Sequence, residues 1–302
     1  MPTDYQALAA KTVERQIVLY EREVTAALQR AQVEIRSDMA AIYDKYADSD
    51  GLLTHAEMTR SNRLVAAEKQ IVGELNKATS ANLTTINRLQ PEMYNASFFH
   101  QAWAIDQTTG LRLDYGSLNI RAIRANLASK EFADALKRYP AVARGRMREA
   151  INNGLIRGQG YPAMMRDIRD ALGMTRGDAM RIVRTEGQRA VNAGTAAAYA
   201  DAEGEGVEGD TVWVSTMDDA TRDQHQSMDG RTRDKDGLFH MPNGETAPHP
   251  LHSSLSAKNV VNCRCTSRYE ITGYSPQLRR DRDAGLIPYQ PYSSWRPPNA
   301  PK

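Results

Sequence analysis

The sequence predicts an α+β fold that is mostly α-helical, and three patterns support this expectation. In the first half of the 302 residues, apolar side chains recur every three or four positions, which is the spacing of amphipathic helices. After Asp210, the segments 211–216 and 261–271 have the composition and alternation of short β-strands. The last 31 residues hold six of the 13 prolines, which disfavour regular structure. We therefore expect long N-terminal helices, a small loop-rich α+β module and an extended C-terminal arm.

The first predicted helix is unusually long. Thr3 and Gln6 have the spacing of a capping box, and an apolar stripe then continues for roughly 40 residues. Its members are Val13, Ile17, Tyr20, Val24, Leu28, Ile35, Met39, Ile42 and Tyr46. Because globular helices average about 11–12 residues, we expect this one to project from a compact body or to pack along a partner.

Further helices are expected over residues 54–203. Thr54 begins the second one, because Glu57 follows it at capping-box spacing. Pro91 is expected to interrupt the next helical stretch, and Pro140 should lie near the start of another. Thr175 has the sequence pattern of a helix N-terminus, so we expect one helix to end before it and another to begin there.

Composition excludes several classes of protein. The net charge is only +2 and the mean hydropathy is −0.59, so the chain as a whole is not a polycation that coats nucleic acid. No run of about 18 apolar residues occurs, which predicts that no segment spans a membrane. The first 16 residues lack the basic and apolar regions of a signal peptide. Two cysteines cannot form a disulfide framework, so we expect a reducing cytoplasm or a particle assembled in it.

Basic residues are concentrated in one part of the chain. Residues 111–170 hold twelve Lys or Arg against six Asp or Glu, whereas residues 201–210 hold five acids and no base. Such a stretch is suited to the phosphates of packaged DNA, and a solvated helical face is the alternative. The candidates for DNA contact are Arg121, Arg124, Lys137, Arg138, Arg144, Arg146 and Arg148.

The segment 261–271 alternates strictly between apolar and polar side chains. Cys263, Cys265 and Tyr269 share one face, which is typical of a half-buried strand. We expect these three side chains to lie with Trp213 in one small core.

Four motifs between about Gly154 and Ile271 carry a resemblance to a known family. In chain order they are RIVRTEGQRAVNAGTAAAYADAEG at 181–204, VWVSTMDDATRDQHQSMDGR at 212–231, LFHMPNGETAPHP at 238–250 and NCRC at 262–265. This ordered set resembles the Mu F-like minor head proteins of tailed bacteriophages, also called the phage head morphogenesis family. The chain then divides into a long-helix region (1–110), a basic helical region (111–153), a Mu F-like module (154–273) and a proline-rich, aromatic arm (274–302).

The resemblance implies a structural virion protein, not an enzyme. It implies a minor capsid component in the phage head near the portal vertex, assembled in the host cytoplasm. Its partners would be the portal protein and other head proteins, and its role head assembly, DNA packaging or DNA delivery during ejection. Two alternatives remain open: a toxin-like nuclease or transferase built on 211–271, or a DNA-binding protein that uses the basic stretch 111–170.

The polar residues of the motifs allow two interpretations. They are Arg184, Glu186, Asp218, Thr221, Arg222 and His225. An active site would use His225 as a base or ligand in an open cleft. We favour a buried polar network that fixes a loop-rich module, because the sequence shows no activated nucleophile, paired carboxylates or phosphate loop. We therefore expect no catalytic residue.

No metal or other cofactor is favoured by the sequence. Zinc candidates are His225, His249, His252, Cys263 and Cys265. On a regular strand, however, the two sulfurs would lie about 6.6 Å apart along the chain direction, so we favour core cysteines and keep zinc and a disulfide as alternatives. Calcium at Tyr46–Glu57 is disfavoured, because Tyr46 stands where a calcium-binding loop begins with a carboxylate.

Overall fold

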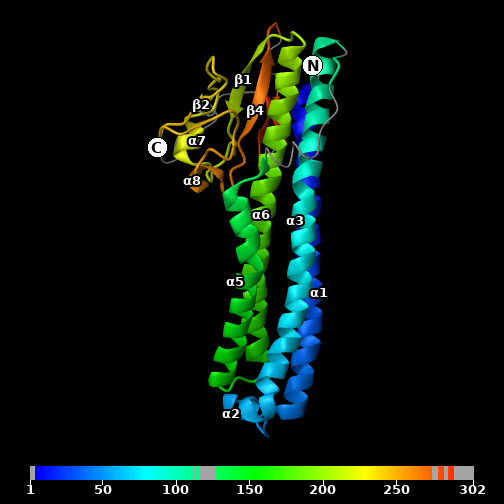
Figure 1. Cartoon of the computed structure of the whole chain (residues 1–302), viewed down its shortest axis with the longest axis vertical. Helices are drawn as coiled ribbons and strands as arrows, with labels where there is room; N and C mark the ends of the chain where they lie inside the picture. The colour runs from blue at the N-terminus through cyan, green and yellow to red at the C-terminus, as the bar shows by residue number, and fades with distance from the viewer. Residues whose placement is uncertain (1–3, 112, 116–126, 274–277, 282–284, 289–302) are drawn as a thin grey trace. The chain divides into compact units, whose positions relative to one another are not determined.

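The computed structural model describes residues 4–111, 113–115, 127–273, 278–281 and 285–288 (Figure 1). Its helices are α1 (Tyr5–Tyr46), α2 (His55–Thr59), the 3-10 helix η1 (Arg60–Asn62), α3 (Arg63–Thr109), α5 (Lys130–Ile156), α6 (Tyr161–Gly204), α7 (Asp223–Gln226) and α8 (Ala257–Val260). Its strands are β1 (Gly209–Val214), β2 (Phe239–His240), β3 (Thr246–Ala247), β4 (Thr266–Ile271), β5 (Leu278–Asp281) and β6 (Gly285–Pro288). The predicted α+β class with long N-terminal helices is confirmed.

Two compact units are each assembled from segments that are distant in the sequence. Unit 1 comprises Met1–Val18, Arg88–Ser129 and Arg184–Lys302. Unit 2 comprises Leu19–Asn87 and Lys130–Val183. The four regions expected from the sequence follow one another along the chain, whereas these units interleave, because long helices contribute one part to each unit.

A single apolar cluster forms the core of unit 2. It joins residues of α1, α3, α5 and α6, among them Leu28, Ile35, Ile71, Met147 and Ile168, none more than 3% exposed. The long stripe of α1 is therefore buried, as the helical period predicts. From Ala27 to Tyr43, the stripe packs against other helices of this chain.

The helix starts follow local hydrogen bonding. Thr54 accepts a bond from the Glu57 amide at 3.3 Å, which confirms the second predicted cap. At the start of α1, the Asp4 carboxylate accepts from the Ala7 amide at 3.0 Å. Gln6, the expected partner in the first capping box, instead donates to the Tyr269 carbonyl at 2.8 Å. Thr3 lies outside the described residues.

Three expected helix boundaries are wrong. Pro91 lies inside α3 and Pro140 inside α5, and α6 passes Thr175 without a break. A proline removes one helical hydrogen bond, and burial of the turns on both sides offsets that loss, as at Leu89 and Met93. The Thr175 hydroxyl does not cap a helix, because it donates to the Ala171 carbonyl one turn earlier.

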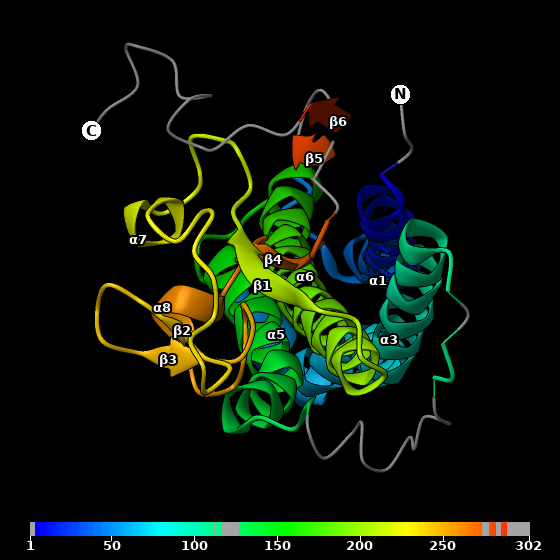
Figure 2. The ribbon, with the colours of Figure 1, turned by 90° about the horizontal axis from the view of Figure 1, so that it is seen from above.

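The β-structure lies in unit 1 and is small. Strands β1 and β4 pair antiparallel from Gly209 opposite Ile271 to Val214 opposite Thr266 (Figure 2). The strand expected over 261–271 begins only at Thr266, because the backbone turns at Asn262, whose φ is 55°. In the described part of the predicted arm, β5 and β6 pair as antiparallel strands.

The predicted small core is divided between two clusters. Trp213, Cys263 and Cys265 belong to one, together with Phe239 and Leu251. Tyr269 belongs to the other, with Tyr199, Ile105 and Ile271, because β4 turns that part of its face toward α3 and α6. The expectation of a single core is therefore wrong for Tyr269.

Although several helices exceed 40 residues, none of those described carries an apolar stretch sufficient to cross a bilayer.

Candidate functional site

A buried polar group on α6 connects it to other segments of unit 1. Glu186 accepts a hydrogen bond from Gln90 at 2.9 Å and pairs with Arg189 at 3.2 Å. Arg189 also donates to the Leu251 carbonyl at 3.1 Å and to the Ser129 hydroxyl at 2.5 Å. Because both charged side chains are almost fully buried, removal of either one would leave the other charge buried without this partner.

Asn192 connects α6 to the strand module, by which we mean residues 209–271. Its side-chain amide is fully buried and donates to the carbonyls of Pro250, at 3.0 Å, and Cys265, at 2.9 Å. Two loops that are distant in sequence are thus held to the same helical turn. Asn and Arg side chains supply the directional donors that such loop carbonyls need.

Asp218 is held by a second group of contacts. Its carboxylate forms a bidentate pair with Arg264, one contact measuring 2.7 Å, and accepts from the Ala220 amide at 3.1 Å. The Thr221 hydroxyl donates to the Thr216 carbonyl at 2.6 Å and lies 3.1 Å from Asp218. Burial alone would raise the pKa of Asp218, but the Arg264 charge and the hydrogen bonds lower it below its ordinary value.

The sequence groups six polar residues into one network, and the structure divides them. Glu186 belongs to the α6 group, Asp218 and Thr221 to the Arg264 group, and His225 to a third group described next. Arg222 is an exposed side chain and donates a hydrogen bond of 2.5 Å to the Val261 carbonyl. Arg184 lies on α6 and is exposed.

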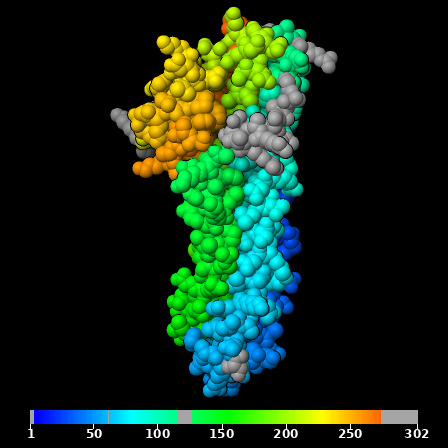
Figure 3. Space-filling model, in the orientation of Figure 1, coloured from blue at the N-terminus to red at the C-terminus, as the bar shows by residue number. Residues whose placement is uncertain are grey.

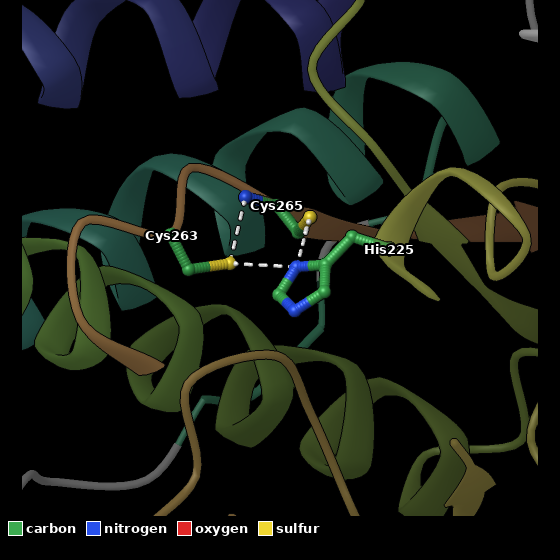
Figure 4. Close-up of side chains that lie close together, drawn as sticks. All are labelled: His225, Cys263 and Cys265. Carbon is green, nitrogen blue, oxygen red and sulfur yellow. Dashed lines mark hydrogen bonds between the residues drawn. The ribbon is translucent and has the colours of Figure 1, made fainter. Parts of the chain in front are cut away.

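His225 faces both cysteines (Figure 4). Its Nδ1 atom lies 3.3 Å from Sγ of Cys263 and 3.3 Å from Sγ of Cys265. The Cys265 amide approaches the Cys263 sulfur at 3.4 Å. All three side chains are buried, at 1%, 4% and 2% exposure respectively. A hydrogen bond from the Cys263 thiol lowers the pKa of Cys265, and the same contact and burial raise the pKa of Cys263.

A chain of hydrogen bonds fixes the tautomer of His225. The Glu245 carboxylate accepts a bond from the Asn259 side-chain amide at 2.9 Å. The Asn259 carbonyl oxygen must then face His225, whose Nε2 lies 3.2 Å away. Because that oxygen can only accept, Nε2 carries the proton and Nδ1 presents its lone pair to the two sulfurs.

The remaining zinc candidates lie elsewhere. Nδ1 of His249 donates to the Pro250 carbonyl at 2.9 Å, and Nδ1 of His252 lies 2.9 Å from the Ser254 hydroxyl. Among the residues that the structure describes, only His225, Cys263 and Cys265 gather as potential metal ligands, with their ligand atoms within 4.8 Å of one another. The two cysteines do not lie on a regular strand, because the backbone turns at Asn262 and β4 begins only at Thr266, so the sulfur separation expected for a strand does not apply.

One small cavity adjoins the Arg264 group. A cavity of about 50 Å³ lies beside Arg264, lined also by Ser215, Thr216 and Gln188. Small-molecule sites usually measure about 300–1,000 Å³, so this cavity is far too small for a nucleotide. In the space-filling view, side chains of the strand module pack closely on the visible face (Figure 3).

The proposed calcium ligands have other partners in unit 2. The Asp48 carboxylate accepts from the amides of Asp50 and Leu52, at 3.0 and 2.8 Å. Glu57 pairs with Arg60 and Arg63. These contacts engage two carboxylates that a calcium-binding loop would use as ligands.

The Lys and Arg side chains predicted to contact DNA differ in whether they are exposed or already paired within the protein. Lys137, Arg138 and Arg148 are exposed on α5. Arg146 is engaged with Asp178 at 2.6 Å, and Arg144 lies 3.5 Å from the Asn76 side chain. Arg121 and Arg124 lie outside the described residues.

Sequence reasoning missed five residues that organise these groups, namely Arg189, Asn192, Glu245, Asn259 and Arg264. Four of them lie inside the quoted motifs, so the motifs contained the signal. Their partners are carbonyls and side chains far away in the chain, which no local spacing reveals.

The model of the Phage Mu protein F like protein family matches residues 145–268, a span that contains Asp218, His225, Arg264 and both cysteines. This part of the chain is similar to the Mu F-like family. The chain is 27% identical over 270 residues to minor head protein GP7 of Bacillus phage SPP1. The aligned region covers 87% of each of the two proteins. The chain is also 26% identical over 259 residues to the NAD(+)–arginine ADP-ribosyltransferase EFV of Enterococcus faecalis, covering 84% of this chain and 52% of that enzyme. No solved structure matches the chain.

Proposed function

We propose that this protein is a minor head component of a bacteriophage virion that acts by binding and not by catalysis. The observation that carries the proposal is the extent of the similarity to the SPP1 minor head protein, which spans 87% of both chains. A match over nearly the full length of a virion protein supports a shared role more strongly than a match to a part of a larger enzyme. The site geometry agrees, because its polar groups bind one another and backbone carbonyls.

Within the head, we place the protein near the portal vertex, in contact with the portal protein and other head proteins. We propose roles in head assembly and in DNA packaging or delivery during ejection, with assembly in the host cytoplasm. The exposed side chains of Lys137, Arg138 and Arg148 on α5 are suited to phosphate contacts with packaged DNA.

The experiment is to purify head particles made with this chain and to determine their protein content by mass spectrometry, with cross-linking to identify neighbours. We expect the chain at a fixed copy number, cross-linked to the portal protein. A chain that stays in the soluble fraction while complete heads form without it would contradict the proposal. As a matched test of DNA contact, Lys137→Gln with Arg148→Gln should reduce packaged DNA without changing incorporation, whereas Lys11→Gln with Arg15→Gln on α1 should change neither.

The similarity to the transferase supports one alternative, an ADP-ribosyltransferase activity. We propose instead that the two proteins share a non-catalytic part, since this chain corresponds to only about half of that enzyme. Incubation of the purified chain with labelled NAD and an arginine-containing acceptor tests this directly. We expect no label transfer, and transfer that depends on Asp218 or His225 would favour the enzyme.

A further inference from the structure

We infer that His225, Cys263 and Cys265 form a zinc site that fixes the strand module. The inference concerns these residues and is independent of the role in the phage head. It rests on the convergence of three ligand-type side chains from two segments, α7 and the turn before β4, on one buried point.

The distances suit a zinc ion. Zinc binds thiolate sulfur at about 2.3 Å and imidazole nitrogen at about 2.0–2.1 Å, so tetrahedral ligands lie about 3.5–3.8 Å from one another. Nδ1 of His225 lies 3.3 Å from each sulfur. These two separations are within a few tenths of an ångström of the tetrahedral values, and all three ligand atoms lie within 4.8 Å of one another.

The orientation of the imidazole matches that of a metal ligand. A ligating histidine presents one nitrogen lone pair to the ion and donates its other N–H to an oxygen. Here Nδ1 presents its lone pair to the two sulfurs, and Nε2–H donates to Asn259, which Glu245 holds from behind.

Charge balance also favours this ion. Two thiolates and a neutral imidazole compensate Zn²⁺ completely, so the loaded site has no net charge to bury among the apolar side chains of its cluster, which include Trp213 and Phe239. Binding displaces the two thiol protons, which pass to solvent. The described residues supply three of the four ligands that zinc usually takes. All three are less than 5% exposed, so an ion held there would link α7 to the turn before β4 inside the module.

The test is zinc analysis of the full-length protein purified without chelator and equilibrated with zinc. We expect one zinc per chain in the wild type and in His252→Gln, a control in the same module. His225→Gln and Cys265→Ser should each lose the metal. Trp213, whose ring lies 6.0 Å from that of His225, should report cobalt binding by fluorescence quenching.

Wild-type measurements remain decisive if the variants do not fold. Cobalt substitution should give thiolate charge-transfer and visible d–d absorption, and a chelator should lower the melting midpoint. The inference is overturned if wild-type protein holds well below one zinc after equilibration, or if native Cys263 and Cys265 form a disulfide. Zinc retained equally by folded His225→Gln and Cys265→Ser would also overturn it.

Discussion

The two units of this protein are stabilised in different ways. Unit 2 has one continuous apolar cluster contributed by four long helices. In unit 1, the strand module has two smaller apolar clusters, and buried polar contacts, such as those of Asn192 and Arg189, hold its loops. Loops expose backbone groups that helices satisfy internally, so a loop-rich module needs side-chain donors and acceptors that a helical bundle does not. The polar residues of the motifs in this module can therefore be explained by their role in holding the loops, without a catalytic role.

The largest expected effect is loss of apolar packing in unit 2. Ile71 is fully buried on α3, so Ile71→Ala should lower the free energy of unfolding by about 2–5 kcal/mol, through lost transfer energy and a cavity. Val65→Ala is the matched control on the same helix, because Val65 is 63% exposed, and it should change stability by about 0.5 kcal/mol or less. Urea denaturation measures both, and equal effects would contradict the assigned core.

Acid should weaken unit 1 through a buried histidine. Burial lowers the pKa of His249 from 6.5 to about 4, and His252, Arg189 and Arg233 add repulsion against its charged form. Between these pH values the unfolded chain binds a proton that the folded chain excludes. Stability is therefore complete above pH 6.5 and is lost as the pH falls toward 4, by about 3 kcal/mol at most.

Replacement of this histidine sharpens that test. His249→Gln should flatten the dependence of unfolding free energy on pH across the window, as measured by denaturant unfolding at its two ends. His55→Gln, an exposed site on α2, should leave the dependence unchanged. If the wild-type curve is already flat, the histidine is not held neutral by burial.

Helix α6 has one glycine in each unit that can be replaced by alanine, Gly194 in unit 1 and Gly173 in unit 2. At Gly194, an added Cβ would lie 2.4 Å from the Tyr94 carbonyl oxygen of α3 and 3.2 Å from the Phe98 amide. Gly194→Ala should therefore cost about 1–3 kcal/mol, because backbone cannot yield as a side chain can. At Gly173 nothing lies within 4 Å, and Gly173→Ala should stabilise by about 0.5–1 kcal/mol. Thermal melting compares them, and a stabilising Gly194→Ala would disprove the close approach.

The difference between the units also explains what the sequence could predict. Apolar periodicity located α1 and its buried face because helix burial depends on local spacing. The same rules misplaced boundaries at Pro91, Pro140 and Thr175, where tertiary packing outweighs a local signal. They also placed 261–271 in one strand, because alternation of burial continues through the turn at Asn262.

The candidate site was predicted only in its residue types. His225 and both cysteines were recognised as potential ligands, yet their approach depends on Asn262 leaving the strand conformation. The partners that orient them, Asn259 and Glu245, come from α8 and a loop and have no fixed sequence spacing to His225. Long-range polar contacts of this kind are a property of the folded chain and not of any local pattern.

The most direct test of the central claim is to compare folding with head incorporation across variants of the polar groups. Asp218→Asn, Arg222→Lys and His225→Gln each alter a group that a catalytic site would require. For each variant, the fraction of folded protein and the amount in purified heads are measured together with particle infectivity. We predict that incorporation and infectivity follow the folded fraction alone. A variant that folds and enters heads at the wild-type level but yields non-infectious particles would contradict the claim and point to catalysis.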